Sequence, residues 1–367
     1  IADIANDAVT ADKLANSINT EIAANTAKTG ITSSQASAIT ANTAKTGISS
    51  AQTSKLSGIE ASATADQTAA QIQGHVTLQL TATSNIGLGT GAVDSITSGN
   101  YNVGLGTDAL TATTSGSYNT AVGRGALDAN TTANFNTGVG YGTLGSNTTG
   151  AENTAFGTWA LEQNVSGANN TAVGKQALEY NTASNNTAVG HSSLKRNTTG
   201  SSNVAVGYDA LNANTTGSSS VAIGKDALKT QTTGFHNAAL GMGALQANTT
   251  GTQNTALGRS ALQTNTTASY NTAVGSTALM ANTTGTSNSA LGYEALVTNT
   301  TGQYHTAIGY RALKSNTDSN NNTAVGFEAL TANTTASNNT AVGQKALQVN
   351  TTGAQNDALG ANTLASN

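Results

Sequence analysis

The sequence predicts a mainly β fold: a parallel β-roll, or β-solenoid, made of 17-residue coils. The first observation behind this prediction is a phrase that reads NTAVGSTALMANTTGTS at 271–287 and returns with variations from about Asn85 onward. Its marker glycine recurs every 17 residues from Gly89 to Gly360, except for one 16-residue interval after Gly174. A fixed short period is typical of solenoids, in which each coil contacts only its neighbours.

The second observation is the residue pattern inside one coil, numbered here from its asparagine so that the marker glycine is position 5. Positions 2 to 4 read Thr-Ala-Val or similar, which predicts a short strand with positions 2 and 4 on one face and the small residues at 3 and 5 on the other. Ala-Leu at positions 8 and 9 indicates a second short strand. Asn-Thr-Thr-Gly at positions 12 to 15 predicts a turn, with glycine free to take positive φ.

Helical repeats are the alternative, since Ala-Leu favours helices. Each coil carries glycine and the β-branched Thr-Thr pair, so no stretch long enough for a stable helix remains.

In a stacked β-roll, equivalent residues of successive coils form ladders, and asparagine side chains can hydrogen-bond to one another along the stack. With only positions 4 and 9 offering sizeable apolar side chains, the core is thin. We therefore expect a parallel homotrimer that packs through the Ala/Gly face at positions 3, 5 and 8.

Composition excludes several classes of function. The 367 residues include 9% charged residues, a net charge of −4, no cysteine and no proline. No basic footprint for nucleic acid is present, and neither disulfides nor thiol chemistry are available. No apolar run reaches the roughly 20 residues of a membrane-spanning helix, so we expect no membrane insertion. The chain starts at Ile1 and stops within a repeat, from which we expect a longer native protein.

The N-terminal part follows a different pattern. Residues 1–20 indicate an extended segment, and 21–60 predict a trimeric coiled-coil stalk with non-helical interruptions. Within the stalk, Ile-x-x-Asn-Thr occurs twice and places Asn25 and Asn42 at core positions, where three amides on the trimer axis could hold an anion or water. A flexible Ala/Thr/Ser linker is the alternative. Residues 61–84 form a neck whose alternation in HVTLQL predicts a strand before the shaft at 85–367.

Two segments carry resemblances to known fibres. Residues 220–224, SVAIG, resemble the head repeat of trimeric autotransporter adhesins, and the Ile-x-x-Asn-Thr phrase is similar to their stalk layers. This resemblance implies left-handed parallel β-rolls assembled as trimers, although the usual head repeat is shorter than 17 residues. The phrases DAVTADKL at 7–14 and KLSGIE at 55–60 resemble bacteriophage tail fibres. Both resemblances imply a trimeric fibre.

No catalytic constellation, metal site or cofactor site is expected. The histidines lie far apart in the chain, and we expect them on the surface: His75, His191, His236 and His305. Glycines recur once per coil and serve the fold, so they do not indicate a nucleotide site. Exposed aromatic residues at the outward corners, positions 6 and 7, are the candidate recognition residues; they are Tyr141, Trp159, Tyr208, Tyr293, Tyr310 and Phe327. They could equally shield the edges of the roll.

The sequence therefore predicts a non-enzymatic structural fibre of a phage tail that spaces and presents host-receptor recognition. Expected partners are two further copies of the chain, virion tail or baseplate proteins, and a host surface glycan or protein. The expected location is the virion. The alternative is a bacterial trimeric surface adhesin or extracellular filament. A polysaccharide-cleaving tailspike would need clustered carboxylates, which the repeats lack.

Overall fold

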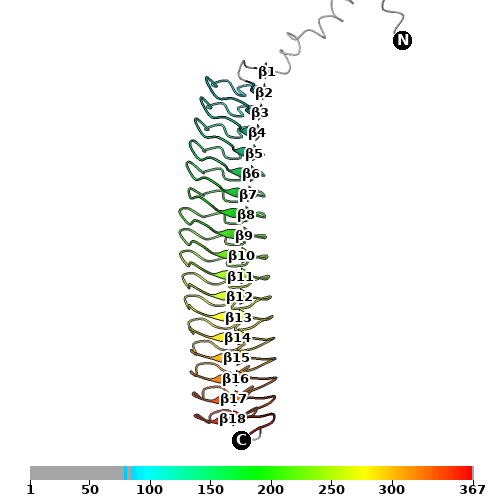
Figure 1. Ribbon diagram of the computed structural model, residues 1–367, viewed down its shortest axis with the longest axis vertical. Coiled ribbons are helices and arrows are strands. Elements are labelled where there is room, and N and C mark those ends of the chain that lie inside the picture. The colour runs from blue at the N-terminus through cyan, green and yellow to red at the C-terminus, as the bar shows by residue number, and fades with distance from the viewer. Residues whose placement is uncertain (1–77, 81–83, 366–367) are drawn as a thin grey trace, which may run out of the picture. The chain divides into compact units, whose positions relative to one another are not determined.

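The computed structural model describes residues 78–80 and 84–365, with side chains from 84 onward. These residues form a parallel β-solenoid of about 16 turns, one strand per 17-residue coil, stacked in chain order (Figure 1). No helix occurs in this part of the chain. The predicted stalk with Asn25 and Asn42, the segment 1–20, most of the neck and His75 lie outside the described residues.

Each strand is three residues long. The strands are β1 Leu78–Leu80, β2 Ile86–Leu88, β3 Val103–Leu105, β4 Thr120–Val122, β5 Thr137–Val139, β6 Thr154–Phe156, β7 Thr171–Val173, β8 Thr187–Val189, β9 Val204–Val206, β10 Val221–Ile223, β11 Ala238–Leu240, β12 Thr255–Leu257, β13 Thr272–Val274, β14 Ser289–Leu291, β15 Thr306–Ile308, β16 Thr323–Val325, β17 Thr340–Val342 and β18 Asp357–Leu359. From β2 to β18 they pair in parallel and in register, position 2 with position 2, as in Thr120 with Thr137. β1 lies within the predicted neck strand and pairs antiparallel with β2.

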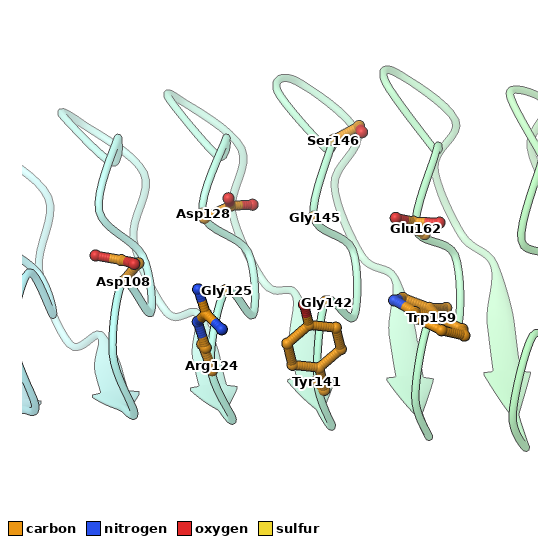
Figure 2. Close-up of a pocket in the computed structure, with 10 residues that line it drawn as sticks. All are labelled: Asp108, Arg124, Gly125, Asp128, Tyr141, Gly142, Gly145, Ser146, Trp159 and Glu162. Atoms are coloured by element: carbon orange, nitrogen blue, oxygen red, sulfur yellow. The ribbon is translucent and has the colours of Figure 1, made fainter.

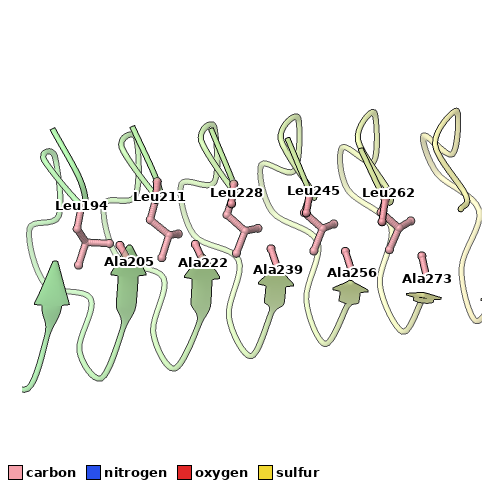
Figure 3. Close-up of a cluster of buried hydrophobic side chains, with 14 of the residues drawn as sticks. Leu194, Ala205, Leu211, Ala222, Leu228, Ala239, Leu245, Ala256, Leu262 and Ala273 are labelled. Atoms are coloured by element: carbon pink, nitrogen blue, oxygen red, sulfur yellow. The ribbon is translucent and has the colours of Figure 1, made fainter. Parts of the chain in front are cut away.

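The strand has its small residue inside, which corrects the predicted inner face. Ala121 of β4 is fully buried, whereas its neighbours Thr120 and Val122 are only partly buried. The middle residue of the strand is buried from β2 to β18, and in most coils the core consists of alanines at positions 3 and 8 and a leucine at position 9. Figure 3 shows these leucines facing the strand alanines across the coil. The coil is too narrow for a second large side chain, so the Ala/Gly face that we expected to pack against sister chains is the interior.

The predicted second strand at positions 8 and 9 is also wrong. Leu127 at position 9 has a φ of 54°, and the equivalent leucines have similar values. Left-handed backbone is costly for a large residue, and complete burial of the leucine side chain offsets this cost. The segment still bonds along the stack, because the Leu127 N–H donates to the Thr143 carbonyl of the next coil at 3.0 Å.

The marker glycine meets two requirements at once. Gly275 has a φ of 136°, and a Cβ at this position would lie 2.5 Å from the carbonyl oxygen of Gly292 in the next coil. Glycine is the residue that adopts such backbone angles without a side-chain clash. The glycine at position 15 differs from our expectation. Gly285 has no positive φ, and the constraint there is the close approach of the Gly302 carbonyl.

Two asparagine ladders run along the interior, as predicted. At position 1, the Asn119 side chain accepts a hydrogen bond from the Asn136 N–H at 2.9 Å, and its Nδ2 donates to Ala133 O at 2.9 Å. At position 12, Asn164 Nδ2 donates to Asn147 Oδ1 at 2.9 Å. Buried amides must be hydrogen-bonded, and these ladders satisfy nearly all of them, with Asn339 Nδ2 left without a partner. The 16-residue coil keeps both ladders because its missing residue lies in the bend after Asn181.

Candidate functional site

The outward face of the sheet is a surface that repeats from coil to coil. It consists of the side chains at positions 2 and 4 of each strand, and we call it the Thr-x-Val face. In β2 to β17 these positions hold Thr, Ser, Ala, Val, Leu, Ile or Phe, and the first charged residue is Asp357 in β18. Large side chains such as Phe156, Leu240 and Leu291 are more than 40% exposed. The apolar side chains form a row at position 4, beside position 2, which is threonine in most strands. A large exposed apolar area is typical of an interaction surface.

The aromatic corner residues lie on the surface, as predicted, and stack along the axis. Tyr293, Tyr310 and Phe327 form one stack, with centroid separations of 5.6 and 5.1 Å. Tyr208 stacks on His191 at 5.4 Å. A further stack at position 17 joins Tyr101, Tyr118 and Phe135. In-register coils place equivalent side chains one strand spacing apart, about 4.8 Å, which accounts for these stacks.

Tyr141 and Trp159 are arranged differently from these stacked rings. Their rings meet edge to face at 6.1 Å. A cation flanks each ring, with the Arg124 guanidinium 6.0 Å from the Tyr141 centroid and the Lys175 ammonium 5.7 Å from the Trp159 centroid. Four successive coils therefore present a row of Arg, Tyr, Trp and Lys. Of the six predicted recognition residues, these two aromatics line a cavity.

That cavity is a groove of about 310 Å³ beside the carboxyl ends of the strands. Figure 2 shows the aromatic row on one side and the carboxylates of Asp128 and Glu162 on the other, with Gly145 between them. Burial raises the pKa of Asp128, with a smaller contribution from Asp108. The pKa of Glu162 is raised mainly by burial and then by Glu179 and Asp128.

The groove exists because two glycines coincide in one coil. Gly142 occupies position 7 and Gly145 occupies position 10. Gly145 is the one glycine at position 10 among the described coils, where the neighbouring coils carry Asp128 and Glu162. The sequence interpretation did not identify Asp128, Glu162 or Gly145, and its expectation that the repeats lack clustered carboxylates is wrong, because Asp108, Asp128 and Glu162 line this groove. A glycine in a position that elsewhere always holds a side chain was the available signal.

Charged residues at other corners pair across coils. Lys229 bonds to Asp226 at 2.9 Å and approaches Asp209 at 3.1 Å. Arg311 and Lys314 both contact Glu294, at 2.8 and 3.1 Å. These pairs are partly exposed and contribute little each. None of the ion pairs within residues 84–365 involves the groove carboxylates Asp108, Asp128 or Glu162.

His305 is buried, which contradicts the expected surface position, whereas His191 and His236 are exposed as expected. His305 replaces an asparagine at position 1 of the ladder. Its Nδ1 accepts from the Asn322 N–H at 3.2 Å, so Nε2 carries the proton and donates to Ser319 O at 2.8 Å. Burial lowers the pKa of His305 to about 4.

The described residues contain no group of three or more metal-binding side chains. They also contain no helix that could cross a membrane. The chain matches no protein-family model, no curated protein and no solved structure.

Proposed function

We propose that this chain is the shaft of a trimeric phage tail fibre, which holds a host-recognition surface away from the virion. Its partners are two further copies of itself, tail or baseplate proteins of the virion, and a glycan or protein on the host surface. The solenoid supports a spacing role because its length grows with every coil, and the outward corners leave room for recognition. Several fibres acting together gain avidity from multivalency.

The observation that carries the proposal is the uncharged Thr-x-Val face. It extends over sixteen successive strands without a charged residue. Soluble monomers seldom expose continuous apolar patches of more than a few hundred Å². Removing large side chains such as Leu240, Leu257 and Leu291 from water contributes roughly 25 cal/mol per Å² of apolar area. Because the face is long, the summed free energy of burying its apolar side chains in an interface is large.

A second copy of the chain is the occupant that fits this face best. The face repeats with the coil spacing along its whole length, and another copy has the same spacing. Parallel copies therefore meet equivalent side chains in every coil, without accumulating mismatch. The three-fold arrangement is the one that the adhesin-like SVAIG segment at 220–224 implies. The Ala/Gly face cannot serve, since its alanines are already buried within each coil.

Mass photometry and sedimentation equilibrium of the full chain test the assembly. A trimer gives three times the chain mass of 36.3 kDa. Ile223→Glu places a charge on the Thr-x-Val face without entering the coil interior, and we expect it to shift the protein toward monomers. Thr199→Glu, at an exposed bend, is the matched control and should leave assembly unchanged. A wild-type chain that stays monomeric at micromolar concentration rules out the trimer.

The alternative is a bacterial trimeric surface adhesin, in which the roll itself is the adhesive surface. The exposed aromatic stacks, such as Tyr293, Tyr310 and Phe327, favour this alternative because aromatic side chains are enriched in binding interfaces. Immunogold electron microscopy distinguishes the two. Label on virion tails supports the phage fibre, and label on the surface of the producing bacterium supports the adhesin.

A further inference from the structure

The groove at Gly145 has the features of a small-ligand site, in contrast to the other corners. Its volume of about 310 Å³ lies at the lower end of the roughly 300–1,000 Å³ that ligand sites occupy. Two aromatic rings, three carboxylates and one guanidinium line it, contributed by Tyr141, Trp159, Asp108, Asp128, Glu162 and Arg124. The other aromatic stacks lack an equivalent gap, because position 10 in their coils carries a side chain.

The missing side chain at position 10 sets the width of the groove. Asp128 and Glu162 lie two coils apart, roughly 10 Å at the usual strand spacing. In the coil between them, a Cβ on Gly145 would lie 3.4 Å from Asp128 Oδ1. Any longer side chain at this position would occupy the space between the two carboxylates. The gap therefore exposes both carboxylates to a ligand at the same time.

The aromatic side of the groove offers an apolar surface of defined orientation. Trp159 is partly buried, and a Cβ on Gly142 would lie 3.0 Å from its Cδ1, so the indole occupies the space above that glycine. Tyr141 meets it edge to face, and Arg124 and Lys175 flank the pair. These contacts hold the rings in place before a ligand arrives, which lowers the entropic cost of binding.

The chemistry of the two sides selects the ligand. The aromatic side suits an apolar C–H surface, and the carboxylates are hydrogen-bond acceptors with no cation in contact among the described ion pairs. A pyranose ring has an apolar face and a rim of hydroxyl donors. Three carboxylates against one guanidinium disfavour an anionic sugar. We propose that the groove binds one or two rings of an uncharged glycan, with Trp159 and Tyr141 against the ring face and Asp128 and Glu162 accepting from its hydroxyl groups.

This inference rests on the recognition part of the proposed function and is independent of the number of chains. The test uses the full chain on an array of neutral, amino-sugar and sialylated glycans, followed by calorimetry with the best ligand. Binding of neutral glycans is expected. Retention of sialylated glycans alone, of a lysine-rich peptide instead of glycans, or of no glycan at millimolar concentration overturns the proposal.

Two variants alter the groove, one by filling the gap at Gly145 and one by removing the Trp159 ring. Each introduces a residue that occurs at the same repeat position in another coil. Gly145→Gln introduces the residue found at position 10 in Gln246 and Gln263, and Gly145 has no positive φ to restrict it. Trp159→Gln introduces the residue found at position 7 in Gln176. Each should weaken glycan binding at least tenfold while thermal stability stays near that of the wild type.

The matched control removes an aromatic residue from a different corner. Tyr270→Ser introduces the residue of Ser287 at position 17 and should leave binding unchanged. Equal loss of binding in this control and in the groove variants, or full binding by both groove variants, overturns the inference. Mass photometry of the same samples separates the two proposals. A trimer that binds no glycan contradicts only the proposal that the groove binds glycans. A monomer that binds glycans contradicts only the proposal that the chain forms a trimer.

Discussion

The backbone N–H of Asn153 donates a 2.9 Å hydrogen bond to the side-chain Oδ1 of Asn136, one coil earlier. The strand of each coil begins directly after this bond. The Asn136 amide also donates to Gly150 O at 2.9 Å, in the bend of the same coil. One side chain therefore bonds both to the next coil and to the bend of its own coil. The ladder is therefore a set of short cross-links that hold successive strands in register.

Asn136→Ala is expected to destabilise the coils around β5 and β6. The change leaves the buried Asn153 N–H without its acceptor, and an unsatisfied buried group costs about 1–3 kcal/mol. Asn136→Ser should cost less, because Ser220 occupies this position naturally and its Oγ accepts from the Asn237 N–H at 3.3 Å. Hydrogen exchange of the Asn153 amide measures the effect locally. Equal protection in the alanine and serine variants would contradict the role of the acceptor.

Gly275→Ala is expected to disrupt stacking between two coils. Its added Cβ would lie 2.5 Å from the Gly292 carbonyl oxygen at a φ of 136°, a backbone angle that costs a non-glycine residue of order 1–3 kcal/mol before the clash is counted. Limited proteolysis should show new cleavage near these coils. Gly138→Ala is the control, because alanine occupies this position in most other coils and its Cβ would meet nothing nearer than 3.5 Å. A proteolysis pattern shared by the two variants would count against this account.

Leu279→Ala and Val274→Ala distinguish the inside of the coil from the outside. Leu279 is fully buried, and its truncation should lower the free energy of unfolding by about 2–5 kcal/mol. Val274 lies on the Thr-x-Val face. Under conditions where the chain is monomeric, Val274→Ala should therefore lower the free energy of unfolding by less than Leu279→Ala does. Chemical denaturation of both variants provides the comparison, read as a difference because long repeat arrays need not unfold in two states. A larger loss from Val274 would reverse the assignment of the two faces.

The stability of the coils around β15 should depend on pH through His305. Its pKa in the folded chain is about 4, below the ordinary 6.5, so the unfolded chain binds more protons between these values. The free energy of unfolding is therefore unaffected by His305 protonation above pH 6.5 and falls as the pH drops toward 4. The full decrease is roughly 3 kcal/mol. Protonated Nδ1 would also face the Asn322 N–H, donor against donor.

His305→Asn restores the ladder residue and should remove this acid sensitivity. Hydrogen exchange of the Asn322 amide at pH 4.5 and pH 7 is the direct measurement, since that amide donates to the histidine ring. The wild type should lose protection at the lower pH more than the variant does. The same pH dependence in both proteins would show that another group is responsible.

Much of the fold could be predicted from the repeat. The period, the strand at positions 2 to 4, the outward corners and the asparagine ladders follow from spacing and residue type. The inner face of the strand could not be predicted, because alternation defines two faces without saying which is buried. We assigned the larger residue, as in Val274, to the core. The width of the coil reverses this, since Ala273 and Leu279 already fill it.

Single exceptions to the repeat were harder to interpret than the repeat itself. Leucine at position 9 gives no sign of left-handed backbone, because this conformation depends on the next coil. His305 falls at position 1, where the surrounding pattern requires a buried amide, and reading its register would have placed it inside. Tyr141 and Trp159 were identified from their position, whereas Asp128 and Glu162 become notable only beside the gap at Gly145.

The parallel register of β2 to β18 has a consequence for how such a chain can change over generations. Every coil presents the same top and bottom to its neighbours, so duplication or loss of one 17-residue unit leaves both new junctions compatible. Recombination between such similar gene segments would then alter the length of the solenoid in increments of about 4.8 Å. Length becomes a property that can be adjusted without redesigning any junction.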